Sequence, residues 1–170
     1  MISRVTKEPI DYTSLVEEVR NHASGAVVLF LGTVREMSEG REVTGLTYDA
    51  YPEMAEAKLA EVIQQASERW PLERVAVIHR YGPLELGDIA VAVVTASVHR
   101  AESFDAARWI MDTIKKVVPI WKKEHWANGA PEWIHPAGSI RPFEQGESIQ
   151  TSRPDNEGGS NHSSNSGGTR

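Results

Sequence analysis

The chain has 170 residues, a formal net charge of −6 and no cysteine, and its length is typical of one domain. The lack of cysteine excludes disulfides, thiol nucleophiles and cysteine-ligated zinc or iron–sulfur clusters, the six histidines show no metal-ligand spacing, and the acidic balance disfavours a general nucleic-acid binder. No apolar run reaches the roughly 20 residues of a membrane span, and the first residues lack the apolar core of a signal peptide, so we expect a soluble, cytoplasmic protein without metal or other cofactor.

Helix and strand signals alternate in the first part of the chain. Ser14 and Glu17 have the spacing of a capping box, which predicts a short helix that Gly25 ends. The apolar run at residues 26–31 (AVVLFL) predicts a strand buried on both faces, and residues 36–42 (EMSEGRE) predict a polar loop.

The middle of the chain predicts a strand, a helix and a further strand. Residues 43–51 (VTGLTYDAY) have strand character, and Pro52 suits the first turn of a helix whose apolar residues keep helical spacing up to Trp70. Residues 74–81 (RVAVIHRY) predict a strand that leads into a turn at residues 81–83.

The longest predicted strand, residues 89–99, is mostly apolar on both alternating sets of side chains, so we expect both of its faces to be covered. A second long helix follows, with Phe104, Ile114 and Val117 among its inward residues, and Pro119 ends it because proline lacks the N–H that continues a helix. Alternating strands and helices predict an α/β or α+β sandwich.

The last segment of the chain has a different composition. Residues 151–170 contain no aliphatic or aromatic side chain, and Gly, Ser and Asn fill twelve of the twenty positions. Such a segment cannot bury enough apolar area to offset its ordering entropy. We therefore predict a single folded domain at residues 1–145 and a disordered Gly/Ser/Asn-rich tail at residues 146–170.

A basic cluster, KKVVPIWKKEHW at residues 115–126, holds four lysines and two tryptophans in an acidic chain. A cation near a helix C-terminus is favoured by the helix dipole, so Lys115 and Lys116 have a structural explanation. The functional alternative is an anion or carbonyl site formed with Lys122. Clustered charge and partial desolvation would there lower a lysine pKa and make the amine a better proton shuttle or nucleophile.

Two further candidate basic sites lie at the ends of predicted strands. Strand ends are a common place for ligands in α/β sheets. His99 and Arg100 close the longest strand, and Arg35 follows a turn at Gly32. Arginine offers a planar fork for phosphate or carboxylate. The alternative to a binding role is a structural one, in which the arginine lies on the surface and the histidine is half-buried. Residues 79–80 are another His-Arg pair inside a predicted strand, and for them we prefer the structural role.

Five blocks of the chain resemble the large, catalytic subunit of molybdopterin synthase, in that family's order and over nearly all of residues 26–134. They are FLGTVRE (30–36), LTYDAYPEMAEAKL (46–59), RWPLERVAVIHRYGPLELGD (69–88), SVHRAESFDAARWIMDTIKKVVPIWKKE (97–124) and the later Trp133. The resemblance implies a two-layer α/β (α+β) fold, hammerhead-like, with an additional small antiparallel β-sheet.

The resemblance also implies a sulfurtransferase of molybdenum cofactor biosynthesis. Such enzymes convert cyclic pyranopterin monophosphate into molybdopterin by inserting two dithiolene sulfurs. The sulfur arrives as a thiocarboxylate on the C-terminal Gly-Gly of a small ubiquitin-like subunit, which suits a chain without cysteine. The implied assembly is a heterotetramer around a homodimer of large subunits, each site drawing residues from both.

The matching motifs carry residue roles onto this chain. Lys115 and Lys122 match the family's two important lysines. We expect Lys115 to be the acid/base or activating group beside the thiocarboxylate carbon, and Lys122 to steer anionic groups and support the pterin intermediate. Arg35, His99 and Arg100 are expected to bind the substrate phosphate, the last two across the dimer.

One position departs from the family pattern, and two other functions stay open. Family members often carry an arginine where this chain has Ala137, and Arg141 is the nearest substitute along the chain. A non-catalytic docking module for a Gly-Gly tail would not need both lysines together with Arg35, His99 and Arg100. A single-stranded nucleic-acid binder that stacks bases on tryptophan is the second alternative.

Overall fold

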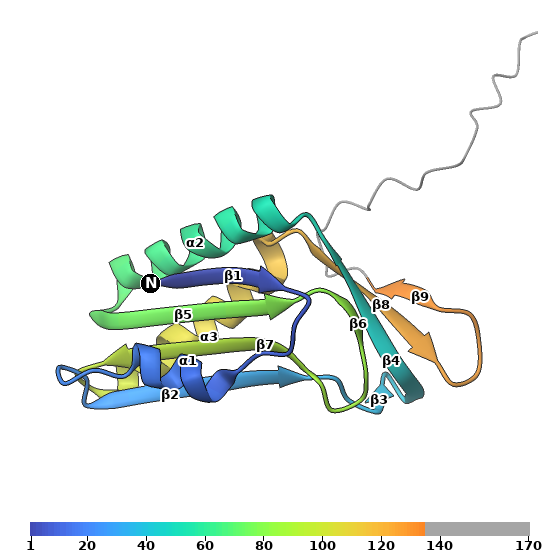
Figure 1. Cartoon of the computed structure of the whole chain (residues 1–170), viewed down its shortest axis with the longest axis horizontal. Coiled ribbons are helices and arrows are strands. Elements are labelled where there is room, and N and C mark those ends of the chain that lie inside the picture. The colour runs from blue at the N-terminus through green and yellow to red at the C-terminus, as the bar shows by residue number, and fades with distance from the viewer. Residues whose placement is uncertain (135–170) are drawn as a thin grey trace, which may run out of the picture.

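The computed structural model describes residues 1–134, which form nine strands and three helices (Figure 1). In chain order the elements are β1 (Ile2–Thr6), α1 (Tyr12–Val19), β2 (Ala26–Thr33), β3 (Met37–Ser38), β4 (Arg41–Ala50), α2 (Pro52–Arg69), β5 (Leu72–Arg80), β6 (Gly82–Leu84), β7 (Ile89–Ser97), α3 (Arg100–Val117), β8 (Ile120–Trp126) and β9 (Glu132–Ile134). The predicted domain end at residue 145, the tail at residues 146–170, Ala137 and Arg141 lie outside the described residues.

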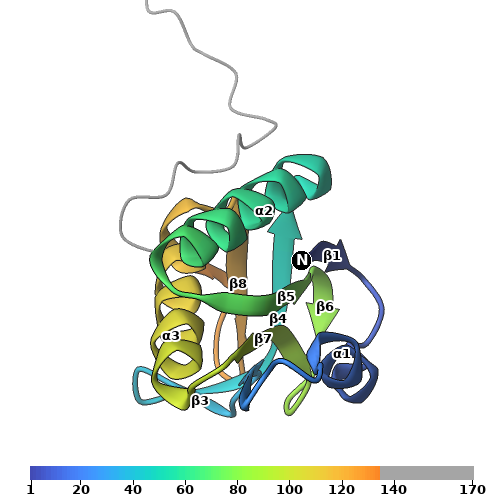
Figure 2. The ribbon, with the colours of Figure 1, turned by 90° about the vertical axis from the view of Figure 1, so that its left-hand side faces the viewer.

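The first sheet has four strands in the order β1-β5-β7-β2. Strand β1 runs parallel to β5, and the other neighbours are antiparallel. Helices α2 and α3 cover one face and α1 covers the other (Figures 1 and 2). The central strand β7 is buried from Ala90 to Ser97, which confirms the prediction that both of its faces are covered.

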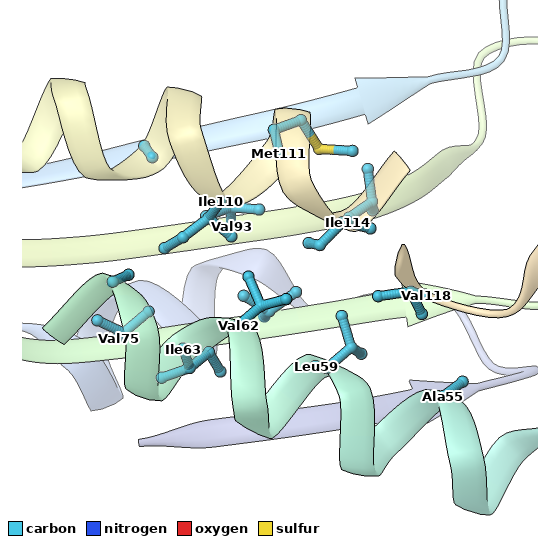
Figure 3. Close-up of a cluster of buried hydrophobic side chains, with 14 of the residues drawn as sticks. Ala55, Leu59, Val62, Ile63, Val75, Val93, Ile110, Met111, Ile114 and Val118 are labelled. Atoms are coloured by element: carbon cyan, nitrogen blue, oxygen red, sulfur yellow. The ribbon is translucent and has the colours of Figure 1, made fainter. Parts of the chain in front are cut away.

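The main core lies between this sheet and the two long helices. Figure 3 shows Leu59 and Val62 of α2 and Ile110 and Ile114 of α3 directed into one layer with Val93 of β7. All five side chains are nearly inaccessible to solvent. Burial of a large aliphatic side chain stabilises a fold by roughly 1.5–3 kcal/mol, so this layer fixes how α3 lies on the sheet.

A second sheet stands beyond one end of the first and has the order β3-β4-β8-β9, with β6 also paired to β4 (Figure 1). Its pairs are antiparallel. A separate apolar cluster, which includes Val43, Leu46 and Trp126, holds it together. The arrangement is mixed α+β with an added antiparallel sheet, as the resemblance implies.

Helix α1 begins before the predicted start at Ser14. Asp11 is its N-cap, and the Asp11 carboxylate accepts a hydrogen bond from the backbone N–H of Ser14. The capping-box prediction was wrong because aspartate is as good a cap as serine and takes the position first. The helix ends at Val19, so Gly25 does not stop it. Glycine is needed at position 25 because a Cβ there would lie 2.3 Å from the carbonyl oxygen of Val98.

Strand β2 is an edge strand and none of its residues is fully buried, so the prediction that it is buried on both faces was wrong. Its Phe30 is 40% exposed. The polar loop predicted at residues 36–42 contains β3, which forms a hairpin with β4. Glu39 and Gly40 form the tight turn with φ of 51° and 77°, the left-handed conformations that a two-residue hairpin of type I′ requires.

Helix α3 ends before Pro119, as predicted, but two of its expected inward residues face solvent. Its buried stripe passes through Ser103, Ala107 and the residues one and two turns further on. Phe104 and Val117 lie off this stripe and are 60% and 48% exposed. Each residue turns the helix by about 100°, so one position decides between core and surface.

Candidate active site

A cavity of about 600 Å³ lies where the two sheets meet the end of α3. Its walls are the end of β2, the start of β7, the last turns of α3 and one face of β4 and β8. Only Val118 and Pro119 separate α3 from β8. The last helical turn and the following strand therefore line the same space.

Three predicted site residues line this cavity: Arg35, Lys115 and Lys122. Lys115 lies in the last turn of α3 and Lys122 on β8. Val34 fixes the chain before Arg35, because its backbone N–H and carbonyl both bond to the turn at residues 87–88. Three cations from distant parts of the sequence thus converge on one space.

The neighbouring lysines do not line the cavity. Successive side chains of a strand point to opposite faces, so Lys123 lies on the other face of β8 from Lys122. Its Nζ lies 5.4 Å from the centre of the Trp133 ring. Lys116 is exposed on α3.

Lys122 is paired with a carboxylate that the sequence analysis missed. Its Nζ lies 2.6 Å from Oε1 of Glu124, which also lines the cavity. Glu124 is only 2% exposed, and its Oε2 has no hydrogen-bond partner within residues 1–134. The two residues are one strand pleat apart, a spacing that could have suggested the pair. Because Glu124 balances its charge, Lys122 contributes little free positive charge, and Arg35 and Lys115 supply most of it.

Tyr48 lies opposite Lys122 on the adjacent strand β4 and lines the same cavity. Burial, aided by the negative charge of Glu124, raises the pKa of Tyr48 to about 12. The phenol therefore keeps its proton at neutral pH and can donate a hydrogen bond to a ligand.

His79, at the end of β5, is buried and also lines the cavity. Its Nδ1 lies 2.7 Å from the carbonyl oxygen of Arg80, and its ring meets the Tyr48 ring edge-on at 5.1 Å. Burial lowers the pKa of His79 to about 4, so the ring is neutral at pH 7. Arg80 is itself buried and forms an ion pair with Asp88 at 3.3 Å. Arg80 thus fits the structural role preferred for this pair, whereas His79 also faces the cavity.

His99 and Arg100 do not line the cavity of their own chain. His99 is the N-cap of α3 and Arg100 its first residue, whereas Lys115 lies in the last turn. At a rise of 1.5 Å per residue, α3 separates the two ends by about 20 Å or more. Buried hydroxyls fix this end of the helix, because Ser97 Oγ donates to the His99 carbonyl and contacts Ser103 Oγ.

Within residues 1–134, no group of three or more His, Asp or Glu side chains could hold a metal ion. None of the helices in that part of the chain is long and apolar enough to cross a membrane.

The chain matches proteins of one family. The family model described as MoaE protein matches residues 5–117. The molybdopterin synthase catalytic subunit of Halalkalibacterium halodurans is 46% identical over 125 residues, which cover 74% of this chain and 80% of that protein. The crystal structure of molybdopterin synthase from Staphylococcus aureus is 40% identical, with a TM-score of 0.74 over 78% of this chain and 96% of that one.

A more distant match shares the fold alone. It belongs to a complex of subunits 1 and 2 of the molybdopterin-converting factor from Helicobacter pylori. It is 20% identical, has a TM-score of 0.62, and covers 82% of this chain and 92% of that one.

Proposed function

Because the chain belongs to the MoaE protein family, we propose that it is the catalytic subunit of a molybdopterin synthase, an enzyme of molybdenum cofactor biosynthesis. The proposed reaction converts cyclic pyranopterin monophosphate to molybdopterin by inserting two dithiolene sulfurs. The observation that carries the proposal beyond family membership is the convergence of Arg35, Lys115 and Lys122 on one cavity. A chain without cysteine suits the reducing cytoplasm, which is the compartment we propose.

The proposed sulfur donor is a separate small ubiquitin-like subunit with a C-terminal Gly-Gly thiocarboxylate. Without cysteine the chain has no thiol of its own to carry the sulfur. A solved two-subunit complex of a protein with this fold supports a small-subunit partner. The tail is anionic and extended, and it would enter a cavity whose unpaired charge is positive.

Within this cavity Lys115 is the proposed activating residue. In the proposed transfer the donor sulfur first bonds to a pterin carbon while it is still joined to the acyl carbon of the tail. Water then attacks that acyl carbon, negative charge develops on its oxygen, and the acyl C–S bond breaks, so the tail leaves as a carboxylate and the sulfur stays on the pterin. An ammonium held at that place stabilises the charge more in the transition state than in the ground state. Arg35 would hold the substrate phosphate through charge-assisted hydrogen bonds. Lys122, positioned by Glu124, would support the pterin intermediate.

His99 and Arg100 are proposed to act in the cavity of a second copy of the chain. They lie at the opposite end of α3 from Lys115, so they reach a shared site only across a homodimer. The proposed assembly is a heterotetramer with this homodimer at its centre. The exposed Phe104 and Val98, beside the His-Arg pair, offer apolar surface for such contact.

The reaction is tested by reconstitution. The protein is mixed with the thiocarboxylated small subunit and cyclic pyranopterin monophosphate, and dithiolene product is measured by mass spectrometry. We expect two sulfurs per pterin and a small subunit that ends as a free carboxylate. Stable complex formation without product would replace the proposal with a docking module. A matched reaction with an unmodified Gly-Gly carboxylate is the control and should give no product.

A further inference from the structure

We propose that His79 binds the pterin directly: its Nε2 accepts a hydrogen bond from an N–H group of the ring. This inference rests on the proposed function, which supplies the pterin as ligand. It assigns a binding role to a residue whose sequence context indicated a structural one.

The hydrogen-bond partner of His79 determines its tautomer. Nδ1 lies 2.7 Å from the carbonyl oxygen of Arg80, and a carbonyl oxygen only accepts hydrogen bonds. Nδ1 must therefore carry the hydrogen. In a neutral imidazole the other nitrogen, Nε2, then bears a lone pair and is an acceptor. Burial of the ring, with its pKa lowered to about 4, keeps the imidazole in this form at neutral pH.

The surroundings of His79 leave this acceptor available. Nε2 makes no hydrogen bond within residues 1–134 and is not among the polar atoms that are sealed from solvent there. Tyr48 packs against the ring edge-on, with an interplanar angle of 80°, and both residues line the cavity. The ring is thus held in place on one side by Arg80 and Tyr48 while it borders the cavity.

Besides His79, the oxygen and nitrogen acceptors among the side chains that line the cavity are the hydroxyls of Thr33 and Tyr48 and the carboxylate of Glu124. Arg35, Lys115 and Lys122 can only donate hydrogen bonds. One oxygen of Glu124 is already engaged by Lys122. An aminopyrimidinone ring brings several N–H groups, and each group that leaves water needs an acceptor. A neutral imidazole meets that need without the negative charge that would repel a phosphorylated ligand and an anionic donor tail.

Two substitutions at position 79 separate binding from packing. His79→Phe keeps the ring shape and the contact with Tyr48 but removes the acceptor, whereas His79→Gln can place an amide oxygen near the former Nε2. The measurements are the Kd of cyclic pyranopterin monophosphate by fluorescence titration, KM and kcat with the thiocarboxylated small subunit, and the Kd of that subunit. Thermal unfolding verifies that each variant is folded.

We expect His79→Phe to raise the Kd and KM for the pterin about tenfold, the usual value of one lost hydrogen bond, with kcat and small-subunit affinity within about twofold of the unsubstituted protein. His79→Gln should recover part of the pterin affinity. The matched control is His125→Phe, which replaces a half-buried histidine bonded to Thr47 Oγ1 at 2.8 Å and outside the cavity lining, and should leave pterin affinity unchanged.

Pterin affinity unaffected in a folded His79→Phe protein would overturn the inference. So would an equal loss of pterin and small-subunit affinity without recovery in His79→Gln, because that pattern means a distorted cavity. The proposed function fails separately, when the unsubstituted protein binds the pterin but forms no dithiolene. In that case the binding titrations still decide the role of His79, and an unsubstituted protein that does not bind the pterin overturns both.

Discussion

The ammonium of Lys122 lies 2.6 Å from a carboxylate oxygen of Glu124, and both side chains border the cavity from the same face of β8. Lys122 is partly exposed, whereas Glu124 is almost fully buried. The Glu124 carboxylate needs the Lys122 ammonium to balance its buried charge. The ion pair in turn fixes the position of the ammonium at the cavity. The pair therefore links the stability of the second sheet to the geometry of the site.

Removal of Lys122 alone should be costly. We expect Lys122→Met to lower the free energy of unfolding by about 3 kcal/mol, because it leaves the buried Glu124 carboxylate without its cation. Replacing both partners with apolar residues, Lys122→Met with Glu124→Leu, should restore much of that stability but not sulfur transfer. Urea denaturation of the single and double variants gives the coupling energy. A double variant whose loss equals the sum of the single losses would mean that the two residues do not interact.

Lys115→Ala should abolish sulfur transfer and leave small-subunit affinity near that of the unsubstituted protein. In the proposed mechanism the lysine ammonium acts on charge that develops during the reaction, and not on the docked surfaces. Single-turnover assays and binding titrations measure the two effects. Lys116→Ala removes the adjacent charge outside the cavity lining and is the matched control, expected to be fully active. Wild-type turnover in Lys115→Ala would remove this residue from the mechanism.

A site shared between protomers predicts complementation between two inactive variants. In a mixed dimer of Lys115→Ala and Arg100→Ala chains, one site carries both substitutions and the other carries neither. Random mixing should therefore recover about one quarter of wild-type activity. Subunit exchange followed by the dithiolene assay measures it. Mixing Lys115→Ala with Lys122→Ala is the control, because both lysines line the cavity of one chain, and should give no recovery. If Arg100→Ala and Lys115→Ala chains fail to complement in verified mixed dimers, each site belongs to one chain.

The lowered pKa of His79 predicts that the folded protein loses stability in acid. Its pKa is about 4 in the folded protein and ordinarily 6.5, so between these values the unfolded chain binds a proton that the folded chain does not. The contribution of neutral His79 to the free energy of unfolding is fully present above pH 6.5 and falls as the pH drops toward 4. Between about pH 7.5 and about pH 5 we expect His79 to account for a loss of about 2 kcal/mol in the free energy of unfolding.

Urea denaturation at those two pH values tests this expectation. His79→Phe should show a smaller loss on acidification than the unsubstituted protein, whereas His125→Gln should retain the full loss. Equal pH dependence in His79→Phe and the unsubstituted protein would mean that His79 is not neutral in the folded state.

Much of the main sheet and its helices could be predicted from side-chain periodicity. The apolar spacing of α2 and the two apolar sets of β7 reflect burial that each element needs wherever it packs. Strands β1, β3, β6, β8 and β9 were not predicted, because they are short, polar or interrupted by charge. In β8 the lysines at 122 and 123 interrupt the alternation of apolar and polar residues that would predict a strand. Its buried residues are Trp121, Glu124 and Trp126, and their burial depends on contacts with the rest of the protein.

The sequence by itself determined the family and the candidate residues Arg35, Lys115 and Lys122, because motif residues keep their type and spacing along the chain. Only the tertiary structure decided which of them share a cavity, that Glu124 balances Lys122, that His79 lines the same cavity, and that His99 and Arg100 lie at the far end of α3. The physical reason is that charge, protonation and access depend on neighbours brought together by folding. Most such neighbours lie far apart along the chain, and even Lys122 and Glu124, two positions apart, pair because β8 places both side chains on one face.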